Sequence, residues 1–171
     1  MTVRTLVLLR HAKAETPGEL LDFERRLTEK GDADADAAGS WLADERLRPN
    51  LVLCSSARRT RQTWQGVSVA LRQADPDALS PEVHYEQRLY DGGRTEVIDL
   101  LRAVPDSVRT VLVIGHNPTM SDVSILLRPY DGEGALAALR TAGMAVHRAE
   151  GPWSLTEPFS MPLVTEHTAR G

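Results

Sequence analysis

Apolar residues along this chain follow two patterns that alternate from the N-terminus onward. Continuous apolar runs occur at 5–9 (TLVLL), 50–54 (NLVLC) and 109–115 (RTVLVIG). Such unbroken runs are typical of strands that are covered on both faces of a sheet. Between them, residues 29–47 and 57–73 have the three- and four-residue apolar spacing of amphipathic helices. The sequence also predicts a weaker strand at 83–86, short helices at TEVIDLLRAV and 119–128, and a last strand at 143–149.

This alternation predicts an α/β fold, in which a mostly parallel central sheet is flanked by helices as a three-layer sandwich. The stretches that resemble linkers are all short: TPGELLD, QADPDALSPE and RPYDGEG. None is long enough to separate domains, so residues 1–171 are predicted to form one domain. The C-terminal stretch WSLTEPFSMPLVTEHTARG could pack on this domain or trail from it, and Trp153, Phe159 and Met161 favour at least partial packing.

Polar clusters follow each of the three strongest predicted strands. These clusters are RHAKAE, CSSARRTRQT and GHNPT. Ligands of open α/β sheets bind outside the carboxyl ends of the strands. We therefore expect all three clusters to lie at one edge of the sheet and to form the functional site.

Composition excludes some classes of partner. The net charge of −4 provides no overall basic field for nucleic acid or an anionic membrane. The single cysteine, Cys54, cannot form an intramolecular disulfide. No segment has the length of a secretory h-region or of a transmembrane helix. The expectation is a soluble, cytoplasmic protein that binds neither nucleic acid nor membrane.

The chemistry predicted at this edge is phosphate binding. The residues there are rich in cations and hydrogen-bond donors and poor in carboxylates: Arg10, His11, Arg58, Arg59, Arg61, His116 and Asn117. The guanidinium fork of arginine matches phosphate oxygens in bidentate fashion. A neutral imidazole beside a phosphate held in this way can attack phosphorus and form a phosphohistidine, which water then hydrolyses. Arginines that supply the positive charge make a metal unnecessary.

Structural roles are the alternative for each residue taken singly. A histidine at a strand end is more often a hydrogen-bonded structural residue, and a run of arginines on a helix is usually a solvated face. The coincidence of several such residues at one edge weakens that alternative for His11 and His116. His84, His147 and His167 have no matching partners in the sequence, so structural roles are expected for them.

Two other phosphatase chemistries fit the sequence poorly. Protein tyrosine phosphatases place an arginine six residues after the nucleophilic cysteine, but the residue at that distance from Cys54 is Thr60. Cys54 is therefore predicted to be a small buried residue. Metal-dependent hydrolysis lacks an HExxH motif and a cluster of Asp and His ligands, so no metal or other cofactor is expected.

Four segments resemble the histidine phosphatase superfamily, which includes the cofactor-dependent phosphoglycerate mutases. LRHAKAE resembles its Arg-His-Gly signature, with Ala12 in place of the glycine. The Arg-His-Ala form resembles the small phosphohistidine phosphatase branch, the SixA-like proteins. RRLTEKG (25–31), SSARRTRQT (55–63) and IGHNP (114–118) resemble further segments of that branch in the same order. The resemblance covers roughly residues 3–120 and implies a phosphoglycerate mutase-like fold.

The resemblance also implies roles for individual residues. His11 is the nucleophile that becomes phosphorylated, Arg10 and Arg59 clamp the phosphoryl oxygens, and His116 completes the pocket as a donor. Asn117 either contacts the phosphate or caps the next helix. Lys13 and Thr16 lie close enough in sequence to line the mouth of the pocket.

The general acid is the least defined role. The glutamate of phosphoglycerate mutases corresponds to Asp91 in QRLYDGG, which could protonate a leaving oxygen or simply begin the turn at DGG. Glu15 and Glu96 are lesser candidates. Without a clear acid, a phosphoramidate such as phosphohistidine, or an activated phosphoester, is favoured over a sugar phosphate, because the imidazole of a phosphohistidine leaves more easily than an alkoxide.

The predicted function is hydrolysis of phosphohistidine or phosphomonoester substrates through a covalent intermediate on His11, without metal. The short connection after Val67 lacks the insertions that roof the pocket in mutases, which favours a phosphohistidine on a partner protein. The alternatives are a phosphatase or mutase for small sugar or nucleotide phosphates, a phosphate-binding module without catalysis, and a nucleic-acid binder using ARRTR.

Overall fold

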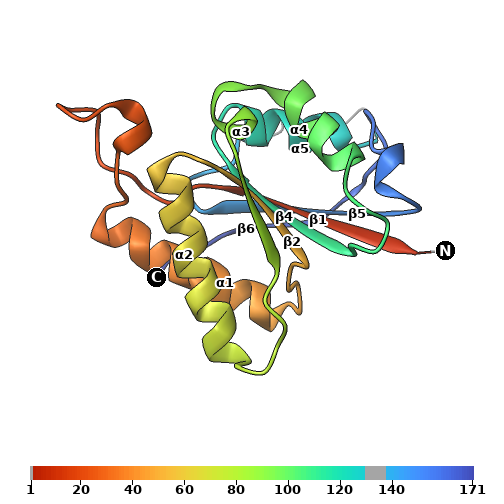
Figure 1. The fold of residues 1–171 in the computed structure, drawn as a ribbon, viewed down its shortest axis with the longest axis horizontal. Coiled ribbons are helices and arrows are strands. Elements are labelled where there is room, and N and C mark those ends of the chain that lie inside the picture. Colours follow the sequence, from red (N-terminus) through yellow and green to blue (C-terminus); the bar gives the residue numbers. More distant parts are fainter. Residues whose placement is uncertain (1, 130–137) are drawn as a thin grey trace.

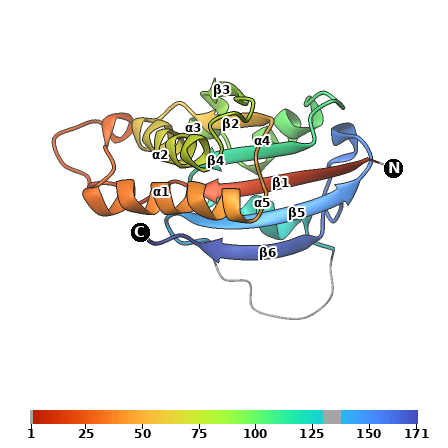
Figure 2. The same ribbon diagram turned by 90° about the horizontal axis from the view of Figure 1, so that it is seen from below.

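The apolar runs form the centre of a six-stranded sheet. The computed structural model, which describes residues 2–129 and 138–171, orders the strands β3-β2-β4-β1-β5-β6 (Figures 1 and 2). The strands are β1 (Val3–Arg10), β2 (Leu51–Ser55), β3 (Glu82–Glu86), β4 (Thr110–Gly115), β5 (Gly143–Glu150) and β6 (Leu163–Thr168). The pairings among β3, β2, β4 and β1 are parallel, whereas β5 and β6 add antiparallel pairs. The sheet is mostly parallel, as the sequence predicts.

Helices cover both faces of the sheet, because successive side chains of a strand point to opposite faces. Leu6 and Leu8 of β1 pack in one apolar cluster, and Val7 and Leu9 pack in the other. The second cluster includes α1 (Glu29–Asp44) and α2 (Arg58–Ala74). The first includes α3 (Arg88–Asp91), α4 (Arg94–Arg102) and α5 (Thr119–Leu127). Figure 1 shows these two groups on opposite sides of the sheet, which confirms the predicted α/β architecture.

The helices α1 and α2 pack closely because glycines lie at their contact. A Cβ atom on Gly39 would lie 2.5 Å from the backbone oxygen of Val67, and one on Gly66 would lie 2.8 Å from the Cβ of Ala35. Side chains at these points would push the helices apart. The pair therefore fixes where the first turn of α2, which carries Arg59, sits relative to the sheet.

The C-terminal stretch packs on the sheet. Trp153, in the short helix η2 (Trp153–Leu155), is buried, as is Met161, whereas Phe159 is exposed. β6 then pairs with β5. The prediction that 143–149 would be the last strand is therefore wrong. β6 is an edge strand that is mostly exposed, and it lacks the continuous apolar run that marks a buried strand.

The three strongest strands end at the same edge, as predicted. In the register of the sheet, Arg10 of β1 pairs with Gly115 of β4, and Cys54 of β2 pairs with Ile114. The polar segments after these strands consequently emerge side by side.

Within the described residues, no helix is both long and apolar enough to cross a membrane.

Candidate active site

A small pocket lies at this edge of the sheet, with a volume of about 280 Å³. It brings together five of the predicted site residues, which lie far apart in the sequence. Among the described residues that line it, only Ala14 is apolar, so these residues suit a polar, anionic ligand. The residues that line it are Arg10, His11, Lys13, Ala14, Arg25, Arg59, His116, Asn117 and Thr141.

His11 follows the end of β1, and a hydrogen bond fixes its tautomer. Its Nδ1 lies 2.7 Å from the carbonyl oxygen of Ala12. A carbonyl oxygen only accepts hydrogen bonds, so Nδ1 carries the proton and Nε2 keeps its lone pair. The side chain is only 8% exposed. Burial lowers the pKa of His11 to about 4, and the positive charges of Arg59 and Arg10 contribute to this lowering. His11 is therefore neutral at neutral pH, with the lone pair of Nε2 unprotonated.

The chain after His11 is held by hydrogen bonds to the segment before α1 and to a side chain of α2. The amide of Thr28 donates to the carbonyl of Lys13 over 3.0 Å, and the amide of Ala12 donates to Thr63 Oγ1 over 3.1 Å. A Cβ atom on Gly31 would lie 2.1 Å from the same carbonyl of Lys13. Only glycine permits this approach, which gives a physical reason for the glycine of RRLTEKG.

Arg59 and Arg10 enter the pocket from different elements. Arg59 lies in the first turn of α2 and is 6% exposed. Its Nη1 and Nη2 donate to the backbone oxygen and to Oδ2 of Asp22, over 2.8 and 3.1 Å. Arg10 ends β1, and its Nη1 donates to the carbonyl of Leu139 over 3.0 Å. One side of each guanidinium is thus anchored.

Asp22, which begins the short helix η1 (Asp22–Glu24), gathers three donors at the rim of the pocket. Its carboxylate accepts from Tyr90 Oη at 2.6 Å and from Arg59, and it forms a 3.0 Å ion pair with Arg25. The hydrogen bond from Tyr90, with the charge of Arg59, lowers the pKa of Asp22 to about 2. Asp22 is therefore ionised and occupies the arginine fork as a phosphate oxygen would.

His116 follows β4 and faces His11, with the ring centroids 5.3 Å apart. Its Nε2 lies 2.7 Å from Ser55 Oγ at the end of β2. Burial, together with the nearby His11 and Arg59, lowers the pKa of His116 to about 3. When the hydroxyl of Ser55 donates to Nε2, the proton of the neutral ring sits on Nδ1 and points away from Ser55.

Three buried nitrogen atoms of the pocket lack a hydrogen-bond partner within residues 2–129 and 138–171. They are Arg10 Nε, Arg59 Nε and His116 Nδ1. Two further such atoms, in Arg4 and Arg128, belong to side chains that do not line this pocket. A buried donor without a partner costs roughly 1–3 kcal/mol. An anion with several acceptor oxygens would supply the missing partners around His11.

Of the other residues predicted for the site, some line the pocket and some do not. Asn117 lines the pocket, and its Oδ1 accepts from both the amide and the hydroxyl of Ser121 in α5. Lys13 also lines the pocket, whereas Thr16 does not. Asp91 is exposed on α3 outside the pocket lining, and it accepts a long 3.4 Å hydrogen bond from Gln87.

The lesser acid candidates lie outside the lining and have other partners. Glu96 accepts from the amide of Gly93 at the start of α4, and Glu15 pairs with Arg26 at the surface.

Cys54 is buried, and burial raises the pKa of its thiol to about 12. The thiol therefore stays protonated, in agreement with its predicted structural role. The described residues contain no cluster of three or more His, Cys, Asp or Glu side chains suited to a metal ion.

Sequence reasoning missed Asp22, Arg25, Tyr90, Ser55 and Thr141. The first two lie in an irregular segment without apolar periodicity, so no local pattern predicts their position. A weak signal was available: Arg25 is the first residue of the RRLTEKG segment, and Asp22 lies three residues before it. Tyr90 precedes Asp91, and here the structure brings the neighbour of the predicted acid, rather than the acid itself, to the pocket rim.

The profile of the histidine phosphatase superfamily (branch 1) matches residues 6–90. An uncharacterized protein of Mycobacterium tuberculosis, Rv1276c, is 37% identical over 168 residues, covering 95% of this chain and 100% of that protein. The chain belongs to the histidine phosphatase superfamily. An uncharacterized chloroplastic protein of Arabidopsis thaliana, At3g52155, is 30% identical over 92% of this chain and 72% of its own length.

Solved structures narrow the resemblance to one branch of the superfamily. The "putative phosphohistidine phosphatase SixA" from Nakamurella multipartitia has a TM-score of 0.86 and 32% identity, over 99% of this chain and 98% of that chain. Its counterpart from Agrobacterium tumefaciens has a TM-score of 0.75 and 29% identity, over 96% and 97%. The predicted family is thus confirmed, and SixA-like proteins are among its structural neighbours. This membership supports the prediction that the protein is a phosphatase-like hydrolase.

Proposed function

We propose that the protein hydrolyses phosphohistidine on a partner protein, through a phosphohistidine intermediate on His11. The observation that carries this proposal is the neutral imidazole of His11, with Nε2 unprotonated, beside the Nε donors of Arg10 and Arg59 and the Nδ1 atom of His116, which lack partners among the described residues. These donors suit the oxygens of a phosphoryl group. They would stabilise the charge that builds on those oxygens in the transition state.

The reaction has two steps. In the first, the lone pair of His11 Nε2 attacks phosphorus, the bond from phosphorus to the substrate nitrogen breaks, and that nitrogen leaves with the bond's electron pair and takes up a proton. In the second, water attacks phosphorus, the bond to Nε2 breaks, and phosphate leaves with His11 regenerated. Arg10, Arg59 and His116 are proposed to hold the phosphoryl oxygens throughout both steps.

Two features favour a phosphorylated protein over a sugar or nucleotide phosphate. The pocket volume of about 280 Å³ lies just below the usual range for small-molecule sites. The described residues that line it carry no phenyl, phenol or indole ring and no extended apolar surface on which a base or a sugar ring could pack. The pocket accommodates a phosphoryl group, and the remainder of the substrate would lie outside it. The buried thiol of Cys54 fits a reducing, cytoplasmic setting.

The test is hydrolysis in the presence of EDTA by the wild-type protein and by His11→Ala. A phosphohistidine peptide and an aryl phosphate are compared as substrates. We expect the peptide to be preferred, EDTA to have no effect, and the variant to be inactive on both. Activity on the aryl phosphate but not on the peptide would move the substrate to a small molecule. Loss of wild-type activity in EDTA, with recovery on adding a divalent metal, would contradict the metal-independent mechanism.

A further inference from the structure

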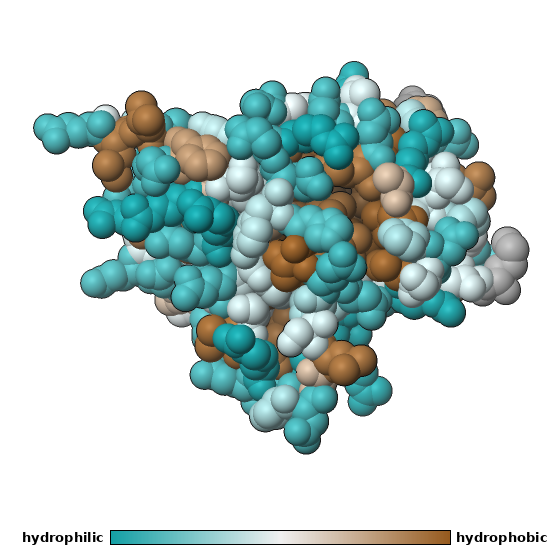
Figure 3. Space-filling model, in the orientation of Figure 1, coloured by the Kyte–Doolittle hydropathy of each residue, from teal (hydrophilic) through white to brown (hydrophobic). Residues whose placement is uncertain are grey.

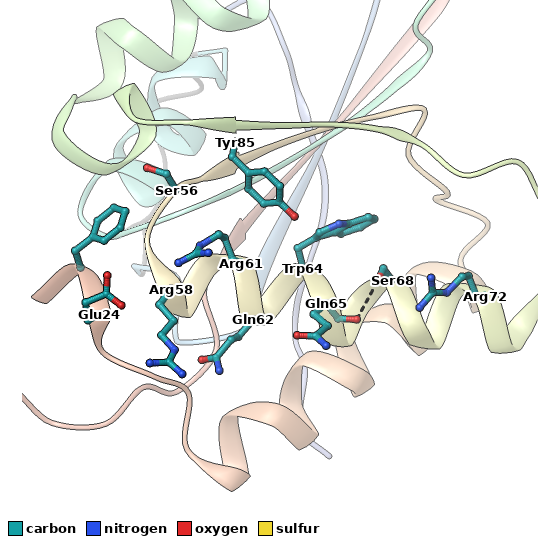
Figure 4. Close-up of a pocket in the computed structure, with 11 residues that line it drawn as sticks. Glu24, Ser56, Arg58, Arg61, Gln62, Trp64, Gln65, Ser68, Arg72 and Tyr85 are labelled. Atoms are coloured by element: carbon teal, nitrogen blue, oxygen red, sulfur yellow. Dashed lines mark hydrogen bonds between the residues drawn. The ribbon is translucent and has the colours of Figure 1, made fainter. Parts of the chain in front are cut away.

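A second and larger cavity runs along α2, and it shares no lining residue with the pocket around His11. This α2 groove has a volume of about 1000 Å³ and is open to solvent. Figure 4 shows its walls: α2 forms one side, Tyr85 projects from β3 on the other, and Glu24 of η1 lies at one end. Figure 3 shows that the surface on the α2 side of the molecule is mainly hydrophilic.

The residues that α2 contributes to the groove include a polar stripe along the helix. Arg58, Arg61, Gln65, Ser68 and Arg72 follow one another at spacings of three and four residues, which places them along one side of the helix. At 1.5 Å per residue, the stripe is about 21 Å long. An extended peptide of about six residues has the same length.

The groove has a strong excess of positive charge. Three arginines line it, Arg58, Arg61 and Arg72, against one carboxylate, Glu24. None of the three arginines forms a salt bridge with another described residue. The chain as a whole carries a net charge of −4, so this positive region is local. An acidic partner would be attracted to this groove rather than to the protein in general.

Neighbouring residues of η1 and α2 line the groove and contact the pocket around His11. On η1, Asp22 contacts Arg59 of the pocket, whereas Glu24 lines the groove. On α2, Arg59 enters the pocket and the adjacent Arg58 lines the groove. A chain with its phosphorylated residue at His11 could therefore continue past η1 into the groove.

We infer that the α2 groove binds an extended, acidic segment of the phosphorylated partner protein, adjacent to the phosphorylated residue. The inference rests on the proposed function and adds the chemistry that selects the partner. Arg58, Arg61 and Arg72 pair with carboxylates of the segment, and Tyr85 provides an apolar surface for it opposite α2. Because the arginines are exposed or half-buried, their pairing accelerates association and weakens with salt.

The experiment measures binding and catalysis separately on the same proteins. Fluorescence anisotropy follows the binding of a fluorescein-labelled peptide, in which one histidine is followed by six residues rich in Asp and Glu. A second peptide carries Ser and Gln in place of the acids. The proteins are wild type, Arg61→Glu/Arg72→Glu and Arg102→Glu. Arg102 is a matched control because it is an exposed arginine in the last turn of α4, as Arg72 is in the last turn of α2.

We expect the acidic peptide to bind wild type and Arg102→Glu at least about 10-fold more tightly than it binds the double variant. The neutral peptide should not distinguish the three proteins, and the preference should fade at high salt. Equal affinity of the acidic peptide for all three proteins would overturn the inference. Tighter binding of a single-stranded oligonucleotide than of the peptide, lost in the double variant, would also overturn it and would assign the groove to nucleic acid.

Aryl phosphate hydrolysis separates this inference from the proposed function. All three proteins should hydrolyse the aryl phosphate at the same rate, because neither arginine lines the catalytic pocket. Groove-dependent peptide binding without any hydrolysis would retain the docking surface and contradict the phosphatase. Hydrolysis of the aryl phosphate without groove-dependent peptide binding would retain the phosphatase and contradict the docking surface.

Discussion

Histidines with lowered pKa values occur in two regions of this molecule, and their hydrogen bonds differ. On the α5 side of the sheet, His147 is fully buried, its Nε2 pairs with Ser124 Oγ at 2.9 Å, and its Nδ1 pairs with the carbonyl of Met161 at 2.9 Å. At the carboxyl edge, His116 has a partner for Nε2 but none, among the described residues, for Nδ1. Burial lowers the pKa of His147 to about 4 and that of His116 to about 3.

The comparison shows that burial and a lowered pKa do not by themselves mark a functional histidine. His147 has both properties, and its two nitrogen atoms are already paired, as is usual for buried polar groups. His11 and His116 differ because they lie beside arginines whose buried Nε atoms lack partners. Unpartnered nitrogen atoms that converge on one pocket, rather than the shifted pKa values, indicate a site suited to an anion.

The largest effect that separates the two regions should come from His11→Ala. Loss of the nucleophile is expected to lower kcat by at least about 10⁴-fold. His147→Gln, which removes an equally buried histidine outside the pocket, should keep kcat within a few-fold of wild type. Steady-state hydrolysis of an aryl phosphate measures both. An active His11→Ala variant would remove the basis for the catalytic assignment.

Arg59→Ala should have the next largest effect. In the proposed mechanism it removes a charge-assisted donor to the transferring phosphoryl group, and such losses raise the barrier by about 2–4 kcal/mol, which lowers kcat by roughly 30- to 10³-fold. Arg128→Ala is the matched control, since Arg128 also has a buried Nε without a described partner but pairs with Glu166 outside the pocket. Turnover of Arg59→Ala at the wild-type rate would show that the phosphate clamp is misplaced.

Stability should depend on pH through His147. A histidine in the unfolded chain takes up a proton near pH 6.5, whereas His147 in the folded protein does so near pH 4. The unfolded state binds more protons between these values, so the free energy of unfolding falls as the pH is lowered from 6.5 to 4. The contribution of His147 is at most about 3 kcal/mol at pH 4.

Urea denaturation of wild type and His147→Gln at pH 7 and pH 4 measures this contribution. The variant should lose less stability than wild type between the two pH values, although His11 and His116 still contribute in the same direction. Equal losses in the two proteins would show that His147 titrates normally in the folded state.

The smallest effect should come from Asp22→Asn. The carboxylate of Asp22 occupies the fork of Arg59, and its side chain is 52% exposed. Half-exposed ion pairs contribute roughly 0.2–1 kcal/mol. Removing the charge should therefore strengthen the binding of inorganic phosphate by about 2- to 5-fold, as measured by competitive inhibition. Weaker phosphate binding in the variant would show that Asp22 supports the clamp rather than competing with the ligand.

The acid limb of the activity profile follows from the pKa of His11. In the proposed mechanism the neutral form of His11 attacks, so kcat/KM should be constant above the pKa and should fall as the pH decreases through about 4. The profile must be corrected for ionisation of the substrate phosphate. A corrected rate that rises below pH 4 would indicate another nucleophile.

Much of the site could be predicted because buried strands are recognisable in the sequence from their continuous apolar runs. The apolar runs define β1, β2 and β4, and parallel pairing then places the residues after them at one edge. Arg10, His11 and His116 follow directly from that geometry. The position of Arg59 also depends on α2, whose amphipathic pattern is evident in the sequence.

The remaining features depend on contacts between distant segments. Asp22 and Tyr90 are 68 residues apart, and no local pattern indicates that they share a hydrogen bond at the pocket rim. β6 is fixed by pairing with β5 rather than by its own apolar pattern. Asp91 shows that a family resemblance can be off by one residue. The resemblance points to Asp91, but its neighbour on α3, Tyr90, is the residue that hydrogen-bonds to Asp22.

The most direct test of the account is to identify the phosphorylated residue during turnover. The wild-type protein is mixed with a ³²P-labelled substrate, quenched in alkali within the first turnovers, digested and analysed by mass spectrometry. The account predicts an acid-labile, alkali-stable phosphoryl group on His11, absent in His11→Ala and present in His147→Gln. Steady turnover without this label, or with the label on another residue, would contradict it.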